Sequence, residues 1–223
     1  HYQQAKSIFL AHQQQFKYDY RITVCLYLMN QCIYYCHGQQ TQFAAEYLEY
    51  IKYLIEDEAY MKDRGLSFAM YVNSVYMAQI DEQLDWAEDF VTNYTQLLDH
   101  KDPESIRELS YASIAFSRGA FKKAAVHLAT VSSADLYFKI TQYKLTIKIL
   151  YEDRSLSSLK DRLATFKRYI ERQENLHQSR KDKNHAFTKA VKQLIDPKSK
   201  KTPLSPSDFM ILDYRWLKEK WET

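Results

Sequence analysis

The segment at residues 111–128, YASIAFSRGAFKKAAVHL, constrains the fold more than any other part of the chain. Its apolar residues recur at the three- and four-residue spacing of an amphipathic helix, both before and after Gly119. Gly119 permits the tight turn that such a break requires. Ala112 and Ala124 are small enough for two helices to approach closely, and Leu128 fills the space between them. The segment therefore predicts two helices joined as a hairpin.

Composition extends this prediction to the whole chain. Only three glycines and four prolines occur among 223 residues, too few for the many turns of a strand-rich fold. Hydrophobic residues make up 46% of the chain, which is enough to build a packed core. No apolar run approaches the ~18 residues of a membrane span, so we expect no membrane-embedded segment. The chain does not begin with methionine, and we expect it to be part of a longer protein.

Helical periodicity predicts four hairpins in succession. Each pairs two amphipathic stretches across a short polar break. The expected hairpins cover residues 21–57, 66–98, 104–131 and 136–173, with an entry helix at residues 4–16 and a further helix at residues 185–195. Asp102 is expected to cap the third hairpin ahead of Pro103, and Ser155 is expected to cap the second helix of the fourth.

Stacking explains how such hairpins build a core. One hairpin cannot bury its apolar stripe alone, whereas stacked neighbours share a continuous core. The predicted fold is therefore all-α: a superhelix, or solenoid, of antiparallel helical hairpins that forms one elongated domain over residues 1–195. Residues 196–223 are predicted to be a linker rich in lysine and proline, followed by a capping helix. That helix is expected to start at Ser207 or Asp208 and to dock through its aromatic residues.

The third hairpin resembles a tetratricopeptide repeat. Ala112, Gly119, Phe121, Ala124 and Leu128 occupy the small, turn, aromatic, small and large positions of that repeat. The resemblance implies a stack of helical hairpins, an architecture that usually binds other molecules and rarely catalyses.

The other hairpins match the repeat less closely. The LDWA sequence at residues 84–87 resembles its junction between turn and second helix but lacks the glycine, and Arg154 and Lys160 stand near the turn and small positions of the fourth hairpin. Most of the chain also resembles a group of tetratricopeptide-like proteins from Bacteroidetes-type bacteria. The segments that carry this resemblance are MNQC at 29–32, LDWAEDF at 84–90, KLTIKILYE at 144–152, FKRYIER at 166–172 and WL at 216–217. The resemblance implies that this chain is the C-terminal half of a longer protein, and it implies no activity.

No residue pattern points to catalysis or to a cofactor. The seven histidines are scattered, without a His-Glu-x-x-His motif, and the three glycines lie too far apart to form a phosphate-binding loop. Cys25, Cys32, Cys36 and His37 raise the alternative of a metal site. All three cysteines lie on an apolar stripe without a Cys-x-x-Cys spacing, however, which favours a role in the core. We expect no metal, no cofactor and no enzyme activity, and the odd cysteine count fits a reducing, cytoplasmic compartment.

Tyrosine spacing suggests a surface for a partner. Tyr20, Tyr27 and Tyr34 recur at intervals of seven residues among nineteen tyrosines. A tyrosine ring with its hydroxyl at a wet edge suits peptide recognition, and it suits interhelix packing as well. We predict Tyr27 and Tyr34 as partner-binding residues, together with Ser113 and Ser117 on the leading helix of the third hairpin. Serine at these positions departs from the charged residues with which some tetratricopeptide repeats hold a terminal carboxylate.

Charge is distributed unevenly along the chain. Residues 1–112 hold 8 Lys/Arg against 16 Asp/Glu, a net −8, whereas residues 113–223 hold 23 against 12, a net +11, for a total of +3. Residues 160–201 alone hold 13 Lys/Arg and 5 Asp/Glu. This surplus fits non-specific nucleic-acid binding, self-association through the oppositely charged halves, or solvated helix faces. The basic residues predicted as contacts are Arg162, Lys167, Arg168 and Arg172.

These observations predict a non-catalytic scaffold that binds a protein or peptide partner on a helical-repeat surface. The alternative is a helical-repeat protein that binds nucleic acid through its basic C-terminal half.

Overall fold

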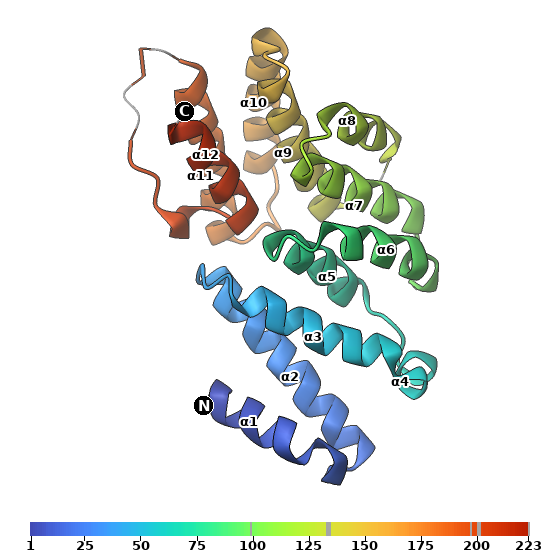
Figure 1. The fold of residues 1–223 in the computed structure, drawn as a ribbon. Helices are drawn as coiled ribbons and strands as arrows, with labels where there is room; N and C mark the ends of the chain where they lie inside the picture. The colour runs from blue at the N-terminus through green and yellow to red at the C-terminus, as the bar shows by residue number, and fades with distance from the viewer. Residues whose placement is uncertain (99, 133–134, 197, 200–201, 223) are drawn as a thin grey trace. The chain divides into compact units, whose positions relative to one another are not determined.

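The protein is helical in both of its parts. A computed structural model describes residues 1–98, 100–132, 135–196, 198–199 and 202–222. Within these residues all regular secondary structure is helical and no β-strand occurs, which confirms the all-α prediction. The chain divides into two compact units, unit 1 (His1–Lys101) and unit 2 (Asp102–Thr223), and Figure 1 labels their helices.

In unit 1, helices that follow one another along the chain pack against each other. The elements are α1 (Tyr2–His12), η1 (Gln13–Gln15), α2 (Tyr18–His37), α3 (Phe43–Glu56), α4 (Glu58–Asp63), α5 (Phe68–Ile80), α6 (Leu84–Tyr94) and η2 (Thr95–Leu97). Helix α3 contacts α2, α4 and α5, and α5 contacts α6. Two helices of the predicted first hairpin, α2 and α3, therefore lie side by side, as Figure 1 shows.

Two elements of unit 1 differ from the sequence prediction. The entry helix, expected at residues 4–16, covers Tyr2–His12 and is followed by η1. The short helix α4 was not predicted. It begins where the carboxylate of Asp57 accepts a hydrogen bond of 3.0 Å from the backbone N–H of Tyr60, and it ends at Asp63, two residues before Gly65, whose φ is 63°.

The core of unit 1 lies where α2 faces α3. The buried side chains of α2 are Ile22, Cys25, Leu28, Met29, Cys32 and Cys36. Opposite them, α3 buries Tyr47, Tyr50, Ile51 and Leu54. The three cysteines are free thiols, and burial raises the pKa of Cys25 to about 12 and that of Cys32 to about 11. Thiols held protonated in a core are inert, which agrees with the predicted packing role of these cysteines.

In unit 2, as in unit 1, helices that are near one another along the chain pack against each other. Its elements are α7 (Pro103–Ser117), α8 (Phe121–Thr130), α9 (Leu136–Glu152), α10 (Leu156–Glu171), α11 (Gln178–Ile195), η3 (Pro206–Asp208) and α12 (Ile211–Glu222). Helix α9 packs against α7, α8 and α10, and α11 packs against α10 and α12. The core between α9 and α12 is lined by Leu159, Leu163, Phe166, Phe187, Trp216 and Leu217, among others.

The ends of several helices in unit 2 correct the sequence analysis. Asp102 caps α7 as predicted, accepting a hydrogen bond of 3.1 Å from the backbone N–H of Ser105. Ser155 precedes α10, but its side chain makes no capping hydrogen bond. Helix α11 begins at Gln178, seven residues before the expected start. Its first two turns are polar and largely exposed, so apolar spacing does not mark them as helical.

The last helix also starts later than predicted. The expected start was Ser207 or Asp208, which lie in η3, whereas α12 begins at Ile211. Phe209, expected on this helix, is buried just before it begins. Of the predicted linker at residues 196–203, Pro197, Lys200 and Lys201 lie outside the described residues.

The four hairpin turns share one capping geometry. Six-residue hydrogen bonds close them, from the N–H of Gln40, Gln83, Ala120 and Ser155 to the carbonyl groups of Tyr35, Ala78, Ala115 and Leu150. In each turn the preceding residue has a positive φ: Gln39 (68°), Glu82 (60°), Gly119 (74°) and Arg154 (55°). This is the Schellman cap, which usually uses glycine. In three of the turns the residue with positive φ is therefore not glycine, although Gly38 lies beside Gln39 in the first.

Glycine at one of these turns is expected to stabilise unit 1. In Glu82→Gly, relief of the left-handed conformation outweighs the extra chain entropy of the unfolded state, and the free energy of unfolding should rise by about 0.5–1 kcal/mol. Urea denaturation measures this change. The matched control is Glu49→Gly, an exposed site within α3, where glycine should lower the same quantity by about 1 kcal/mol. A loss of stability in Glu82→Gly would contradict the turn geometry.

Candidate functional site

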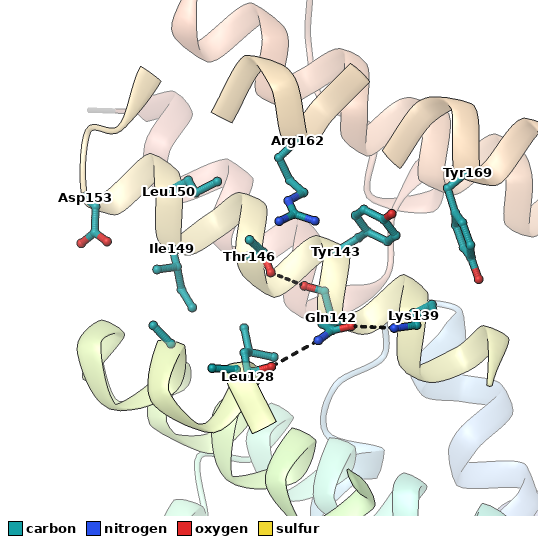
Figure 2. Close-up of a pocket in the computed structure, with 12 residues that line it drawn as sticks. Leu128, Lys139, Gln142, Tyr143, Thr146, Ile149, Leu150, Asp153, Arg162 and Tyr169 are labelled. Atoms are coloured by element: carbon teal, nitrogen blue, oxygen red, sulfur yellow. Dashed lines mark hydrogen bonds between the residues drawn. The ribbon is translucent and has the colours of Figure 1, made fainter. Parts of the chain in front are cut away.

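A groove in unit 2 runs along one face of α9. Helix α9 forms its floor, and α8 and α10 form its walls (Figure 2). Its volume is about 580 Å³, within the range of sites that bind small molecules or short peptide segments. The residues that line it are Ala125, Leu128, Ala129, Lys139, Gln142, Tyr143, Thr146, Ile149, Leu150, Asp153, Arg162 and Tyr169. We call this the α9 groove.

One face of α9 lines the groove, and the opposite face packs into the core of unit 2. Lys139, Gln142, Thr146, Ile149 and Asp153 follow one another at the three- to four-residue spacing of a single helix face. The opposite face of α9 is buried against the helices that follow it in the chain. The groove floor is therefore held from behind by the core of unit 2.

The side-chain amide of Gln142 joins the floor of the groove to the α8 wall through hydrogen bonds. The side-chain Nε2 of Gln142 donates hydrogen bonds of 3.2 Å to the carbonyl oxygens of Leu128 and Val131. These carbonyls lie at the end of α8, where helix geometry offers few backbone partners; that of Leu128 also accepts a hydrogen bond of 3.4 Å from the N–H of Val131. The Gln142 Oε1 atom accepts a longer hydrogen bond of 3.5 Å from Lys139 Nζ. Figure 2 shows Gln142 between Leu128 and Lys139.

Arg162 reaches from α10 over the floor. Its guanidinium carbon lies 5.4 Å from the centre of the Tyr143 ring, a cation–π contact. The Tyr143 ring in turn stacks on Phe166 at 5.3 Å and meets Tyr169 at 5.2 Å. Among the described residues, neither Arg162 nor Lys139 has a carboxylate within ion-pair distance. The one acidic residue that lines the groove, Asp153, lies at the end away from Tyr169 in Figure 2.

A buried ion cluster holds α9 from behind. Lys144 Nζ and Lys148 Nζ each lie 2.7 Å from an oxygen of Asp213 on α12. The rings of Phe187 and Trp216 lie within cation–π distance of Lys148. Burial alone would raise the pKa of Asp213, but the two ammonium groups outweigh it and lower that pKa to about 2. Burial lowers the pKa of Lys148, and Asp213 opposes that shift.

A second polar contact follows the cluster along the same helices. Trp216 Nε1 donates a hydrogen bond of 2.7 Å to Glu152 Oε1, and Lys220 Nζ lies 3.0 Å from the same oxygen. The last helix, expected to dock through its aromatic residues, is therefore held by ion pairs as well. The available signal was a pair of lysines four residues apart within an apolar helical stretch.

In unit 1, an exposed row of tyrosines runs along α2. The side chains of Tyr20, Tyr27 and Tyr34 are 67%, 46% and 70% exposed. Seven residues span nearly two helical turns, so the three rings share one face. Thr23 and Asn30 lie between them and are also exposed. We call these five residues the tyrosine row; it carries no charged side chain.

The eight residues predicted as partner contacts fall in different places. Tyr27 and Tyr34 belong to the tyrosine row of unit 1, and Arg162 lines the α9 groove of unit 2. Ser113 is half-buried and Ser117 is exposed on α7, and neither lines the groove. The remaining three, Lys167, Arg168 and Arg172, are exposed at or just beyond the last turns of α10 and also lie outside the groove.

Known proteins add no constraint to this geometry. In comparisons with family models, curated proteins and solved structures, none matched the chain. Across the part of the chain that the structure describes, no helix is both long enough and apolar enough to cross a bilayer. In that same part, no three His, Cys, Asp or Glu side chains are grouped as ligands for a metal ion.

Proposed function

We propose that the chain is a non-catalytic protein-interaction module, a tetratricopeptide-like solenoid of helical hairpins that binds a protein partner. The tyrosine row carries this proposal. Other tyrosines of unit 1, such as Tyr47 and Tyr71, are fully buried, whereas the row exposes three rings on one helix face. Exposed aromatic side chains that are clustered in this way are typical of protein interfaces.

The solenoid part of the proposal is supported by the repeated turns. All four hairpins are closed by the same capping hydrogen bond, which gives successive hairpins the same local geometry. In unit 2, the leading helix of one hairpin, α7, packs on the leading helix of the next, α9. Such contact between equivalent helices of neighbouring repeats is what stacking requires.

The chemistry of the tyrosine row indicates the kind of surface that would cover it. Its members are neutral: aromatic rings with hydroxyl groups, one threonine and one amide. A matching surface offers apolar side chains to the rings and hydrogen-bond partners to the hydroxyl groups. We therefore propose a folded protein surface or a helix of low charge as the partner of unit 1.

Photocrosslinking tests this proposal in the full chain. A photoreactive phenylalanine at position 27 or 34 is expected to crosslink to the same protein partner, identified by mass spectrometry. Replacement of both Tyr27 and Tyr34 by serine should weaken binding of that partner about tenfold, because two interface rings are lost. The matched control is Leu97, which is 53% exposed in η2 of the same unit: neither a crosslinker there nor Leu97→Ser should have these effects.

Two outcomes would contradict the tyrosine-row proposal. Equal crosslinking from position 97 would show that the contact is not specific to the row. Binding of labelled DNA or RNA that weakens with salt and with Arg168→Glu and Arg172→Glu would instead favour nucleic-acid binding through the basic half. If the captured protein is a second copy of this chain, the tyrosine row is a surface for self-association.

A further inference from the structure

We infer that the α9 groove is a second binding site, which takes an acidic segment of a partner protein. A carboxylate of that segment pairs with Arg162 and Lys139, and a neighbouring apolar side chain packs on Leu128 and Leu150. This site lies in unit 2 and is independent of the tyrosine row.

The positive charges of the groove indicate an anionic ligand. Arg162 and Lys139 bring two positive charges to its lining, and neither meets a carboxylate among the described residues. Elsewhere in unit 2 cations do find acids: Arg107 pairs with Glu104 and Glu108, and Lys220 with Glu152. The groove thus holds cationic groups whose natural complement is an anion from outside.

The Arg162 side chain is already positioned to receive such an anion. Its guanidinium rests over Tyr143, and that ring is held by Phe166 and Tyr169. A guanidinium held beside a ring keeps a planar set of N–H groups that match the two oxygens of a carboxylate. Because the side chain is pre-positioned, little conformational entropy is lost on binding.

The floor distinguishes a peptide from a nucleic acid. Ile149 and Leu150 on the floor and Leu128 on the α8 wall give the groove an aliphatic surface beside the cations, which suits an apolar amino-acid side chain next to an acidic one. Nucleic-acid bases bind by stacking on exposed aromatic faces. Two tyrosines line the groove: the Tyr143 ring is covered by Arg162 and Phe166, and the Tyr169 ring leans against Tyr143. A peptide with an acidic residue next to an apolar one therefore matches both the cations and the aliphatic side chains of the groove.

Selection from a random peptide library displayed on phage, with the full chain immobilised, tests this inference. The enriched peptides are expected to carry Asp or Glu next to an apolar residue. One such peptide, synthesised with a fluorescent label, should bind Arg162→Glu at least about tenfold more weakly than the original chain in anisotropy titrations. Its counterpart with Asn or Gln in place of the acid should bind the original chain weakly, and Arg162→Glu should weaken it little further.

Matched controls separate a specific pocket from general attraction. Lys160→Glu makes the same charge change at an exposed position of α10 outside the groove, and it should alter the affinity less than about twofold. Lys139→Glu repeats the test from the other cation. Thermal unfolding confirms that each variant is folded. Enriched peptides without acidic residues, equal losses in Lys160→Glu and Arg162→Glu, or full displacement by millimolar inorganic phosphate would each overturn the inference.

Discussion

Replacement of Asp213 by asparagine is expected to lower the free energy of unfolding of unit 2 by about 3–5 kcal/mol. Asp213 is the carboxylate partner of both Lys144 and Lys148, and the three side chains are nearly excluded from solvent. Asparagine keeps the shape but leaves two buried ammonium groups without an anion. Urea unfolding followed by tryptophan fluorescence measures the loss, because Trp216 and Trp221 lie on the helix that Asp213 anchors.

A control and a rescue make this result specific. Asp208→Asn removes an exposed carboxylate in the neighbouring η3 and should change the same free energy by less than about 0.5 kcal/mol. Adding Lys148→Met to Asp213→Asn should recover part of the loss, since one of the unpaired charges is replaced by an apolar chain of similar length. A loss below about 1 kcal/mol for Asp213→Asn would contradict the buried ion cluster.

Acid is expected to weaken unit 2 through the same carboxylate. The pKa of Asp213 falls from its usual 3.8 to about 2 in the folded protein. A carboxyl with a lowered folded pKa stabilises the protein above its unfolded pKa, and this contribution disappears as pH falls through the folded pKa. The shift corresponds to about 2 kcal/mol. The free energy of unfolding should therefore drop by that amount between about pH 4 and pH 2.

Lys148 adds a second rise of the free energy of unfolding with pH, at alkaline pH. Its pKa is lowered from 10.5 by burial, so the folded protein holds this proton less tightly than the unfolded chain does. The free energy of unfolding should consequently rise as pH increases from the lowered pKa towards 10.5. Urea titrations at a series of pH values measure both changes, the fall of the free energy of unfolding in acid (the acid limb) and its rise in alkali. The acid limb should flatten by about 2 kcal/mol in Asp213→Asn, and an unchanged acid limb in that variant would assign the loss to other groups.

Local sequence patterns predicted the helices better than their ends. The hairpin of Gly119 was found from spacing alone because its small residues and its turn glycine lie within eighteen positions. The turns at Gln39, Glu82 and Arg154 lie at predicted breaks, but their left-handed residues do not follow from the local sequence, since packing of the two helices imposes that conformation. The start of α11 was missed because its first turns face solvent and so carry no apolar periodicity.

The candidate site was predictable only in fragments. Exposure of Tyr27 and Tyr34 follows from which face of α2 carries the cysteines, and a seven-residue spacing is visible in the sequence. Arg162 was chosen as one basic residue among many, because its position over Tyr143 depends on how α10 packs on α9. The pairing of Lys144 with Asp213 spans 69 residues, and sequence spacing does not report contacts at that range.

The ion cluster also sets an order of events during synthesis. Lys144 leaves the ribosome 69 residues before Asp213, a delay of roughly 3–14 s at 5–20 residues per second. Throughout that interval Asp213 is not available to pair with the two lysines of α9. Their ammonium groups must therefore stay hydrated and cannot yet be buried. Unit 2 therefore completes its packing only after α12 has been translated, so that the whole of α9 to α12 must emerge before this part of the chain becomes native.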